Sequence, residues 1–292
     1  MILDRKKTGL FDIINIAIML GAIFITLYPL YYIFIISISE GGAVARGEIS
    51  FLPKGINWEA YKIVFDDPSI MRSYFNTFVY TVVGVFINLF MTALCAYPLS
   101  RKHFYGRNFF ALAIVFTMFF DGGLIPRYLV VDYLGLLDSM WAIVIPPAIS
   151  VWYMVLMRTF FQNIPDSLYE SAYMDGAGDF KVFLKIVLPL SIPILATMTL
   201  FYAVWHWNSY FPALIYLTDN LKYPMQILLR NIVIEGSMAE QGNQLGGTLG
   251  SLVVVQNIKY AVVVITILPI VMLYPFLQKY FVKGIMVGSL KG

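Results

Sequence analysis

The chain alternates long apolar runs with short polar segments, and the apolar runs have the length of membrane spans. A helix needs roughly 20 apolar residues to cross about 30 Å of hydrocarbon. Six segments meet this requirement: residues 11–36, 74–99, 109–131, 140–161, 183–214 and 258–281. The third segment is interrupted by Asp121-Gly122-Gly123. The pattern therefore predicts an all-α polytopic membrane protein with six transmembrane helices.

Composition agrees with this class. Of the 292 residues, 60% are hydrophobic and only 13% are charged, and the mean hydropathy is +0.76. Soluble domains carry about 25% charged residues. With one cysteine and two histidines, a zinc site of the usual ligand types is close to excluded. We expect a single transmembrane domain over residues 1–292, with core spans within 74–281 and an additional N-terminal span at 11–36.

Positive charges beside the spans predict the orientation, because loops rich in Lys and Arg stay in the cytoplasm. One side comprises residues 1–12, 100–108, 158–185 and 279–292, and carries twelve basic and six acidic residues, a net charge of +6. The other side carries eight basic and eleven acidic residues, a net charge of −3. Both termini and the loop between the fourth and fifth spans are therefore expected in the cytoplasm.

That cytoplasmic loop has the local chemistry of two short helices joined by a glycine turn. Pro165 suits the start of a helix, and Ser167 with Glu170 has the spacing of a capping box. The first helix is expected at residues 168–175, where Gly176 can end it in a left-handed conformation. Asp179 can then cap a second helix that leads into the fifth span. Small residues on this unit, which allow close approach of another chain, are Ser171, Ala172, Gly176 and Ala177.

Enzyme chemistry has little support in the sequence. Gly176-Ala177-Gly178-Asp179 formally matches the Gly-x-Gly-Asp of intramembrane aspartyl proteases, which need two aspartates meeting within the membrane. Here Asp175 and Asp179 lie in one surface loop, and no phosphate-binding loop of the Gly-x4-Gly-Lys-Ser/Thr form is present. An ion-coupled secondary transporter is the stronger alternative. It is disfavoured because such carriers place ionisable residues in mid-span, where this chain has almost none.

The loop resembles the EAA motif of binding-protein-dependent ABC importer permeases. The resemblance rests on Glu170-Ser171-Ala172, then Asp175-Gly176-Ala177, then the Phe183, Ile186, Leu188 and Pro189 positions. Ser171 replaces the first alanine of the family pattern. Residues 281–292 are similar to the Gly-rich Val-Lys-Gly ending of carbohydrate importer permeases of the second maltose-permease type. Asn76-Thr77 and residues 122–129 also look like this family, the latter like a subgroup linked to complex or acidic oligosaccharides.

The resemblance implies a transport subunit without enzyme activity in the plasma (inner) membrane of a bacterium. It implies as partners a homologous permease, an ABC ATPase dimer, an extracytoplasmic solute-binding protein and a carbohydrate substrate, with no nucleic acid. ATP and magnesium would bind to the ATPase, and no cofactor or metal is expected in this chain. A helix in a groove of the ATPase would be formed by Leu168, Tyr169, Glu170, Ser171, Ala172, Tyr173, Met174, Asp175, Gly176 and Ala177.

Candidates for the substrate pathway lie mainly on the fifth span. Tyr202, Trp205 and Ser209 share a helical face, with Asn208 beside them, and Trp152 and Tyr153 on the fourth span are further candidates. Aromatic rings stack on sugar faces, while amides and hydroxyls bond to sugar hydroxyl groups. The alternative is a belt of aromatic residues at the lipid headgroups.

The predicted outer loops, residues 37–72 and 215–257, are long enough to receive a binding protein, although residues 236–250 equally fit a tolerated insertion. Together these features predict a permease subunit of an ABC importer for carbohydrate, with oligosaccharides, including those of the acidic or uronate type, as the substrate class. The alternatives are an ABC permease for a non-sugar solute and an ion-coupled secondary transporter.

Overall fold

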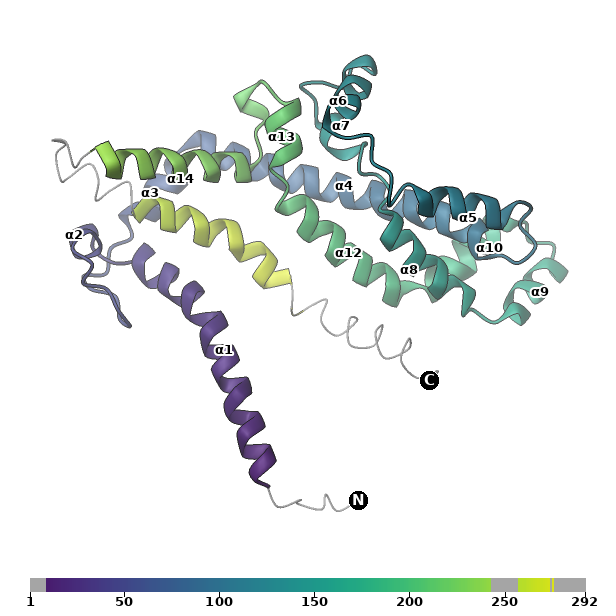
Figure 1. The fold of residues 1–292 in the computed structure, drawn as a ribbon, viewed down its shortest axis with the longest axis horizontal. Helices are drawn as coiled ribbons and strands as arrows, with labels where there is room; N and C mark the ends of the chain where they lie inside the picture. The colour runs from purple at the N-terminus through teal and green to yellow at the C-terminus, as the bar shows by residue number, and fades with distance from the viewer. Residues whose placement is uncertain (1–8, 243–256, 274, 276–292) are drawn as a thin grey trace. The chain divides into compact units, whose positions relative to one another are not determined.

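The computed structural model describes residues 9–242, 257–273 and 275, and every regular element in these ranges is helical (Figure 1). The chain divides into two compact units. The first comprises residues 1–68 and 229–267, and the second comprises residues 69–228 and 268–292. Each unit is described by itself below. The expected single domain stays a prediction, and the expected motif at 281–292 lies outside the described residues.

The helical elements have the following bounds, with the labels of Figure 1. They are α1 Leu10–Ser37, α2 Gly41–Ala45, α3 Glu59–Asp66, α4 Pro68–Ser100, α5 Arg107–Phe116, α6 Leu124–Tyr133, α7 Met140–Val144, α8 Val151–Gln162, α9 Asp166–Met174, α10 Asp179–Val182, η1 Phe183–Val187, α11 Leu188–Leu190, α12 Ile192–Trp207, α13 Phe211–Tyr216, η2 Asn220–Lys222 and α14 Met225–Gly242. A last helix covers Asn257–Leu273.

Two helices are long and apolar enough to cross a membrane alone, and they match two of the expected spans. These are α1, 28 residues long, and α4, 33 residues long. The α1 helix is apolar on all sides and exposes most of its side chains, as a helix surrounded by lipid or another apolar partner does. The described part of the last expected span is helical from Asn257 to Leu273.

The other expected spans are interrupted. The third consists of α5 and α6, separated around Asp121-Gly122-Gly123 as the sequence indicates. The fourth was expected to be continuous but is split into α7 and α8, because Pro146 and Pro147 cannot continue a helical hydrogen-bond ladder. The fifth begins with a π-helical turn, η1, and bends by 79° between residues 179–190 and 192–207. With that pair counted as one span, up to three spans are found in the described residues.

A core in the first unit holds α2 and the end of α1 together. Ile35, Ile36, Ala43 and Ile49 are buried there, with Tyr260 packed against them. The Asn257 side chain donates to the Ser39 carbonyl at 2.8 Å, which joins the last helix to the end of α1. This unit thus brings together segments more than 200 residues apart in the sequence.

The main core of the second unit is formed by the second half of α4 with α8, α9, α10, η1 and α12. Its members include large, fully buried side chains from four of these elements: Phe161, Tyr169, Phe183 and Met198. Because α9 contributes to the same core as the long helices, displacing α9 alone would open this core.

Polar contacts fasten the start of α4 to residues 217–225 in the second unit. The Asn76 amide donates to the carbonyls of Leu221 and Tyr223 at 2.8 and 3.2 Å. The Thr77 hydroxyl accepts from the Met225 N–H at 2.7 Å. The Asn76-Thr77 pair, which the sequence connects only with a family pattern, therefore has a structural reason: both side chains satisfy backbone groups of a segment about 145 residues away.

Asp138, between α6 and α7, attaches a further segment to residues 218–222 through Lys222 and two backbone groups. The Lys222 Nζ lies 2.7 Å from the Asp138 carboxylate, whose other oxygen accepts two backbone N–H groups, those of Thr218 and Asp219, at 3.0 Å each. Asp138 also has a φ of +53°, which is rare for a residue with a side chain. The hydrogen bond from Lys222, followed by those of the two backbone groups, lowers the pKa of Asp138.

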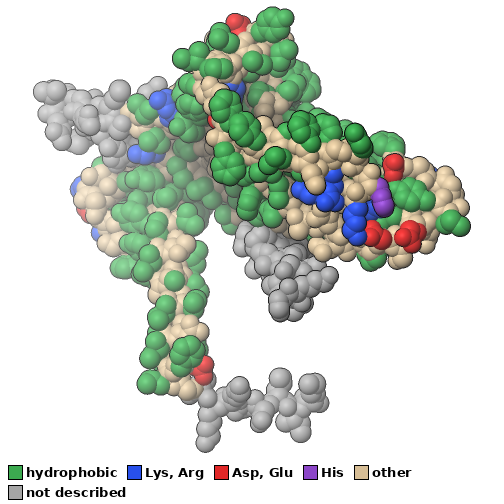
Figure 2. Space-filling model, turned by 45° about the vertical axis from the view of Figure 1, so that its right-hand side comes forward, with side chains coloured by type: hydrophobic (Ala, Val, Ile, Leu, Met, Phe, Trp, Pro, Cys, Tyr) green, Lys and Arg blue, Asp and Glu red, His purple; other side chains and the backbone are tan. Residues whose placement is uncertain are grey.

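Apolar side chains cover most of the face shown in Figure 2, whereas charged side chains and a histidine gather at the end of the second unit that carries α9 and α10. Large apolar residues are exposed along α1, α4, α5 and α6, including Phe24, Phe86, Phe109 and Ile125. An exposed apolar surface of this extent would not be stable in water alone. The surface therefore fits a protein that lies in a bilayer and ends in a polar, water-facing loop.

Candidate coupling loop and transport pocket

The α9 helix covers Asp166–Met174 and ends as the sequence indicates, at a glycine in the left-handed region. Gly176 has a φ of +75°. Its N–H donates to the Tyr173 carbonyl at 3.0 Å, and the Ala177 N–H donates to the Ala172 carbonyl at 2.9 Å. These two bonds form a Schellman motif, which satisfies carbonyls that the last helical turn would otherwise leave unpaired. A Cβ at position 176 would meet no other atom, so the requirement for glycine is one of backbone conformation.

Both expected side-chain caps are wrong. The helix begins at Asp166, so Ser167 already lies inside it, and its hydroxyl is not used as a cap. The hydroxyl of Ser171 instead bonds to the Ser167 carbonyl. Asp179 is the first residue of α10, and its carboxylate accepts a 2.6 Å hydrogen bond from the Tyr173 hydroxyl instead of capping α10. A contact between the two helices thus takes the place of the cap expected from Asp179, while the serine hydroxyl bond of α9 stays within that helix.

The α9 helix is anchored through one face. Tyr169 is 1% exposed and Ala172 is 7% exposed, and both belong to the main core of the second unit. The Arg101 guanidinium lies 3.4 Å from the centre of the Tyr169 ring, a cation–π contact. Lys102 and Arg101 also approach the Asp166 carboxylate, at 3.2 and 3.8 Å. The end of α4 therefore holds the start of α9.

The opposite face of α9 is exposed. It presents residues of the expected coupling set to solvent, with Met174 89% and Tyr173 42% exposed. The other exposed members are Leu168, Glu170, Ser171, Asp175 and Gly176, while Ala177 is half-buried. A helix with one face buried in its own protein and an apolar, partly acidic face outside suits recognition in a groove of another protein. Tyr169 and Ala172 fit the role of anchors of this helix.

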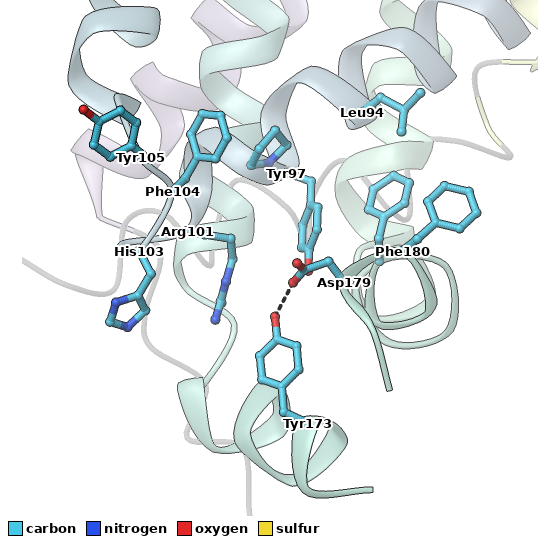
Figure 3. Close-up of a pocket in the computed structure, with 11 residues that line it drawn as sticks. Leu94, Tyr97, Arg101, His103, Phe104, Tyr105, Tyr173, Asp179 and Phe180 are labelled. Carbon is cyan, nitrogen blue, oxygen red and sulfur yellow. Dashed lines mark hydrogen bonds between the residues drawn. The ribbon is translucent and has the colours of Figure 1, made fainter. Parts of the chain in front are cut away.

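A cavity of about 600 Å³ lies beside α9 (Figure 3). Figure 3 shows Tyr173 reaching up from α9 to Asp179, with Arg101 and His103 on the facing loop and Tyr97 above them. Burial raises the pKa of the Tyr173 phenol, and the hydrogen bond to Asp179 adds to this effect. The Tyr173 hydroxyl therefore stays protonated and donating at neutral pH, which keeps α9 and α10 joined across the Gly176 turn.

Candidate residues for the substrate pathway separate into core and exposed groups. Tyr202 is 2% exposed, and its hydroxyl bonds to Thr92 at 2.8 Å and accepts from the Ser150 N–H at 3.2 Å. Tyr153 packs edge-on against Tyr202, with ring centres 4.9 Å apart. With its hydroxyl already bonded inside the core, Tyr202 joins α4, α8 and α12 and has no surface to offer a sugar.

The remaining candidates are more accessible. Trp205 is 41% exposed and lines a pocket of about 310 Å³. Trp152 is 57% exposed, Ser209 is half-buried, and the exposed Asn208 bonds to the Val204 carbonyl and to Gln226. Trp205 is thus the candidate that the structure places in a concave site. Helical spacing predicted that Tyr202 and Trp205 share one face of α12. Packing against α4 and α8 buries Tyr202, however, and leaves Trp205 open to the pocket.

A buried polar cluster behind this pocket was not recognised from the sequence. The His206 Nε2 lies 2.6 Å from the Asn88 Oδ1, and the Asn88 amide donates to the Pro147 carbonyl at 2.6 Å. Asn88 is fully buried and His206 is 4% exposed. A Cβ at Gly84 would overlap the imidazole ring, so Gly84 makes room for His206. The sequence did contain a signal for this cluster. An asparagine and a glycine lie in the middle of one apolar span, and a histidine lies on another.

These features define a class: a multi-pass membrane protein with a surface helix–turn–helix anchored to its spans. The family model of the binding-protein-dependent transport system inner membrane component matches residues 68–287, and the chain belongs to this family. It is therefore a transport component of a bacterial inner membrane and not an enzyme. No group of three or more His, Cys, Asp or Glu that could hold a metal occurs within the described part of the chain.

Curated relatives and a solved structure extend this result. The chain is 42% identical, over 98% of its length and 100% of the relative, to the polygalacturonan/rhamnogalacturonan transport system permease protein YtcP of Bacillus subtilis (strain 168). It is 43% identical to Protein LplC of the same organism, over 99% of this chain and 97% of LplC. A chain from the crystal structure of a bacterial ABC transporter involved in import of the acidic polysaccharide alginate is similar, with a TM-score of 0.85 and 36% identity, covering 94% of this chain and 99% of that chain.

Proposed function

We propose that the chain is one of two permease subunits of an ABC importer for acidic oligosaccharides. Its partners are then a homologous permease, an ATPase dimer that binds ATP and magnesium, and an external solute-binding protein. The family assignment supports the importer class. A relative named for polygalacturonan and rhamnogalacturonan transport, and a similar solved structure from an importer of the acidic polysaccharide alginate, support the substrate class. In this proposal six spans cross the membrane with both termini in the cytoplasm, following the distribution of charge.

The exposed face of α9 is the proposed docking surface for the ATPase. The observation that carries this proposal is the division of α9 into a face buried with α4, α8 and α12 and a face open to a partner. Because Tyr169 and Ala172 are packed in the core, a force on Met174 or Leu168 is transmitted to the long helices as one body. Closure of the ATPase would then rotate the spans and alternate access between the two sides of the membrane.

Replacement of Gly176 tests the docking surface. Gly176→Val places a β-branched residue at φ +75°, a conformation that costs an L-residue roughly 1–2 kcal/mol. We expect the variant to reach the membrane but to lose ATPase co-purification or binding-protein-stimulated ATP hydrolysis. Gly176→Asn should retain both, because asparagine tolerates the left-handed region.

Gly178→Ser is the matched control. Gly178 has a φ of −79°, open space around it and a position at the start of α10 that suits serine. Normal co-purification and normal stimulated ATPase activity in Gly176→Val would refute the docking proposal. Equal loss in Gly178→Ser would show that any change in the loop is damaging, and would refute the specific role of the turn.

Two alternatives, an ion-coupled carrier and an ABC permease for a non-sugar solute, are tested by separate measurements. Uptake that stops with an ATPase-inactive partner but persists with an uncoupler supports the importer, whereas the reverse result supports an ion-coupled carrier. A non-sugar ABC substrate is tested with the binding protein that works with this permease: stimulation of ATP hydrolysis by uronate oligosaccharides supports the proposal, and its absence contradicts it.

A further inference from the structure

We propose that the pocket beside the break between α7 and α8 holds one uronate unit of a passing oligosaccharide, with Arg127 on its carboxylate and Trp205 against its ring. This inference rests on the proposed import of acidic oligosaccharides. The pocket lies wholly within the second unit and is lined by residues of α6, α7, α12 and α13 and of the segment between α7 and α8. Arg127 thereby joins the candidates for the substrate pathway. Of the candidates expected from the sequence, Trp205 is the one that lines this pocket.

The pocket exists because the fourth span is broken. Pro146 and Pro147 follow α7 and leave the segment before α8 outside the helical ladder, so that the two rings form part of the pocket wall. Its volume of about 310 Å³ is at the low end of the range for small-molecule sites. That size fits a single sugar unit within a longer chain better than a whole oligosaccharide.

Arg127 supplies positive charge at the pocket. Its Nη2 donates to Asp121 at 2.8 Å, and its side chain is 55% exposed. Asp121 is itself held by the Gly123 N–H at 3.0 Å, which fixes the guanidinium near the break in the third span. A guanidinium has five N–H donors in a fork that matches carboxylates, and the Asp121 contact uses one of its nitrogens. Arg127 therefore retains donors for a second, incoming carboxylate.

Trp205 and Tyr216 supply aromatic surface on the same concavity. Trp205 is partly exposed, whereas Tyr216 is mostly buried and stacks on Tyr128, with ring centres 6.1 Å apart. Aromatic rings pack against the C–H faces of sugars, while their edges and the tyrosine hydroxyl remain able to interact with polar groups. A flat apolar wall next to a cation is the combination that a uronate ring requires.

The buried cluster behind the pocket positions this wall. The His206 ring lies edge-on to Trp205, with ring centres 4.8 Å apart, and is tied through Asn88 to the Pro147 carbonyl. The buried hydrogen bonds of Asn88 thus connect Pro147 to the imidazole ring that the indole contacts. A single arginine near a span end is often only a headgroup anchor. Here the arginine, the tryptophan and the prolines converge on one concave pocket, which an anchor does not need.

The test uses the full transporter with its binding protein and the trisaccharide of galacturonate as substrate. Arg127→Gln should assemble, and its ATP hydrolysis should still be stimulated by the loaded binding protein. Uptake per ATP should fall by about tenfold or more, because a charge-assisted contact is lost. Arg127→Lys should recover part of the uptake. Lys185→Gln removes an exposed cation that lies outside the pocket, the expected coupling set and the predicted outer loops, and this control should transport normally.

Trp205→Ala provides a second, independent variant in case Arg127→Gln assembles poorly. It should lower uptake while substrate-stimulated ATP hydrolysis persists, and Trp205→Phe should be milder. If the wild type imports the trisaccharide and both Arg127→Gln and Trp205→Ala import it equally well, the inference is overturned and the proposed function is left intact. Loss of stimulated ATP hydrolysis together with uptake would also overturn it, because the residues would then act in docking. If the wild type neither imports the galacturonate trisaccharide nor shows ATP hydrolysis stimulated by it, the proposed function itself is refuted.

Discussion

Removal of the Asn88 side chain is the most direct test of the buried polar cluster. Asn88→Leu keeps a similar volume in α4 but removes the 2.6 Å contacts with His206 and with the Pro147 carbonyl. Both partners are then left in an apolar interior without a hydrogen bond. An unsatisfied buried group costs about 1–3 kcal/mol in soluble proteins, whereas hydrogen bonds between membrane helices average about 0.6 and reach about 1.7 kcal/mol.

The lower range applies to this cluster, because the unfolded chain remains in the membrane, where it also finds partners. Two lost bonds then correspond to about 1–3 kcal/mol of unfolding free energy. Equilibrium unfolding in mixed micelles measures this loss. Asn163→Leu is the control, since the Asn163 amide is exposed and bonds to its own helix at Thr159. Its free energy should change by less than about 0.5 kcal/mol.

A double-mutant cycle separates the hydrogen bond from packing. His206→Phe alone should also destabilise, and the double variant Asn88→Leu/His206→Phe should lose less than the sum of the two single variants. A coupling of about 0.6–1.7 kcal/mol is expected for the His206–Asn88 contact. Additive single losses, or an Asn88→Leu variant as stable as the wild type, would refute the assignment of this cluster as a structural clamp.

Two further predictions follow from the second unit and its outer contacts. Gly84→Ala should cost about 1–3 kcal/mol of unfolding free energy, because the added methyl overlaps the His206 ring, whereas Gly21→Ala in open space should not destabilise in the same assay. Asp138 has a lowered pKa through Lys222, so its stabilising effect is complete above its ordinary pKa and is lost as pH falls below about 4. Melting temperatures of wild type and Asp138→Asn should therefore differ at pH 7 and converge in acid, and a constant difference would contradict this account.

Local chemistry made part of the fold predictable. The left-handed turn at Gly176 follows from residue type, and the break at Asp121-Gly122-Gly123 was visible as a polar interruption. The break at Pro146-Pro147 was equally visible, but hydropathy alone merged α7 and α8 into one span. The apolar runs identify membrane segments well, because hydrophobicity is a property of each segment, while their bends depend on local hydrogen bonding.

The sites depended on contacts that no local pattern contains. Asn88 and His206 are 118 residues apart, and Asn76 reaches a segment 145 residues away. Helical spacing placed Tyr202 and Trp205 on one face, yet the first is buried in the core and the second is open to a pocket. Which side of α12 is covered depends on α4 and α8, and sequence spacing carries no information about those neighbours.

The anchoring of α9 also bears on how a complex is assembled. Because Tyr169 and Ala172 belong to the protein's own core, the proposed docking helix is packed in place without a partner. Binding to a preformed helix avoids the ordering entropy that a disordered segment loses on association. If the ATPase docks on α9 as proposed, it could leave and return without refolding the permease. Exchange of labelled ATPase subunits on membranes that already contain this protein would reveal such a reversible step, and a common pool of ATPases could serve several permeases.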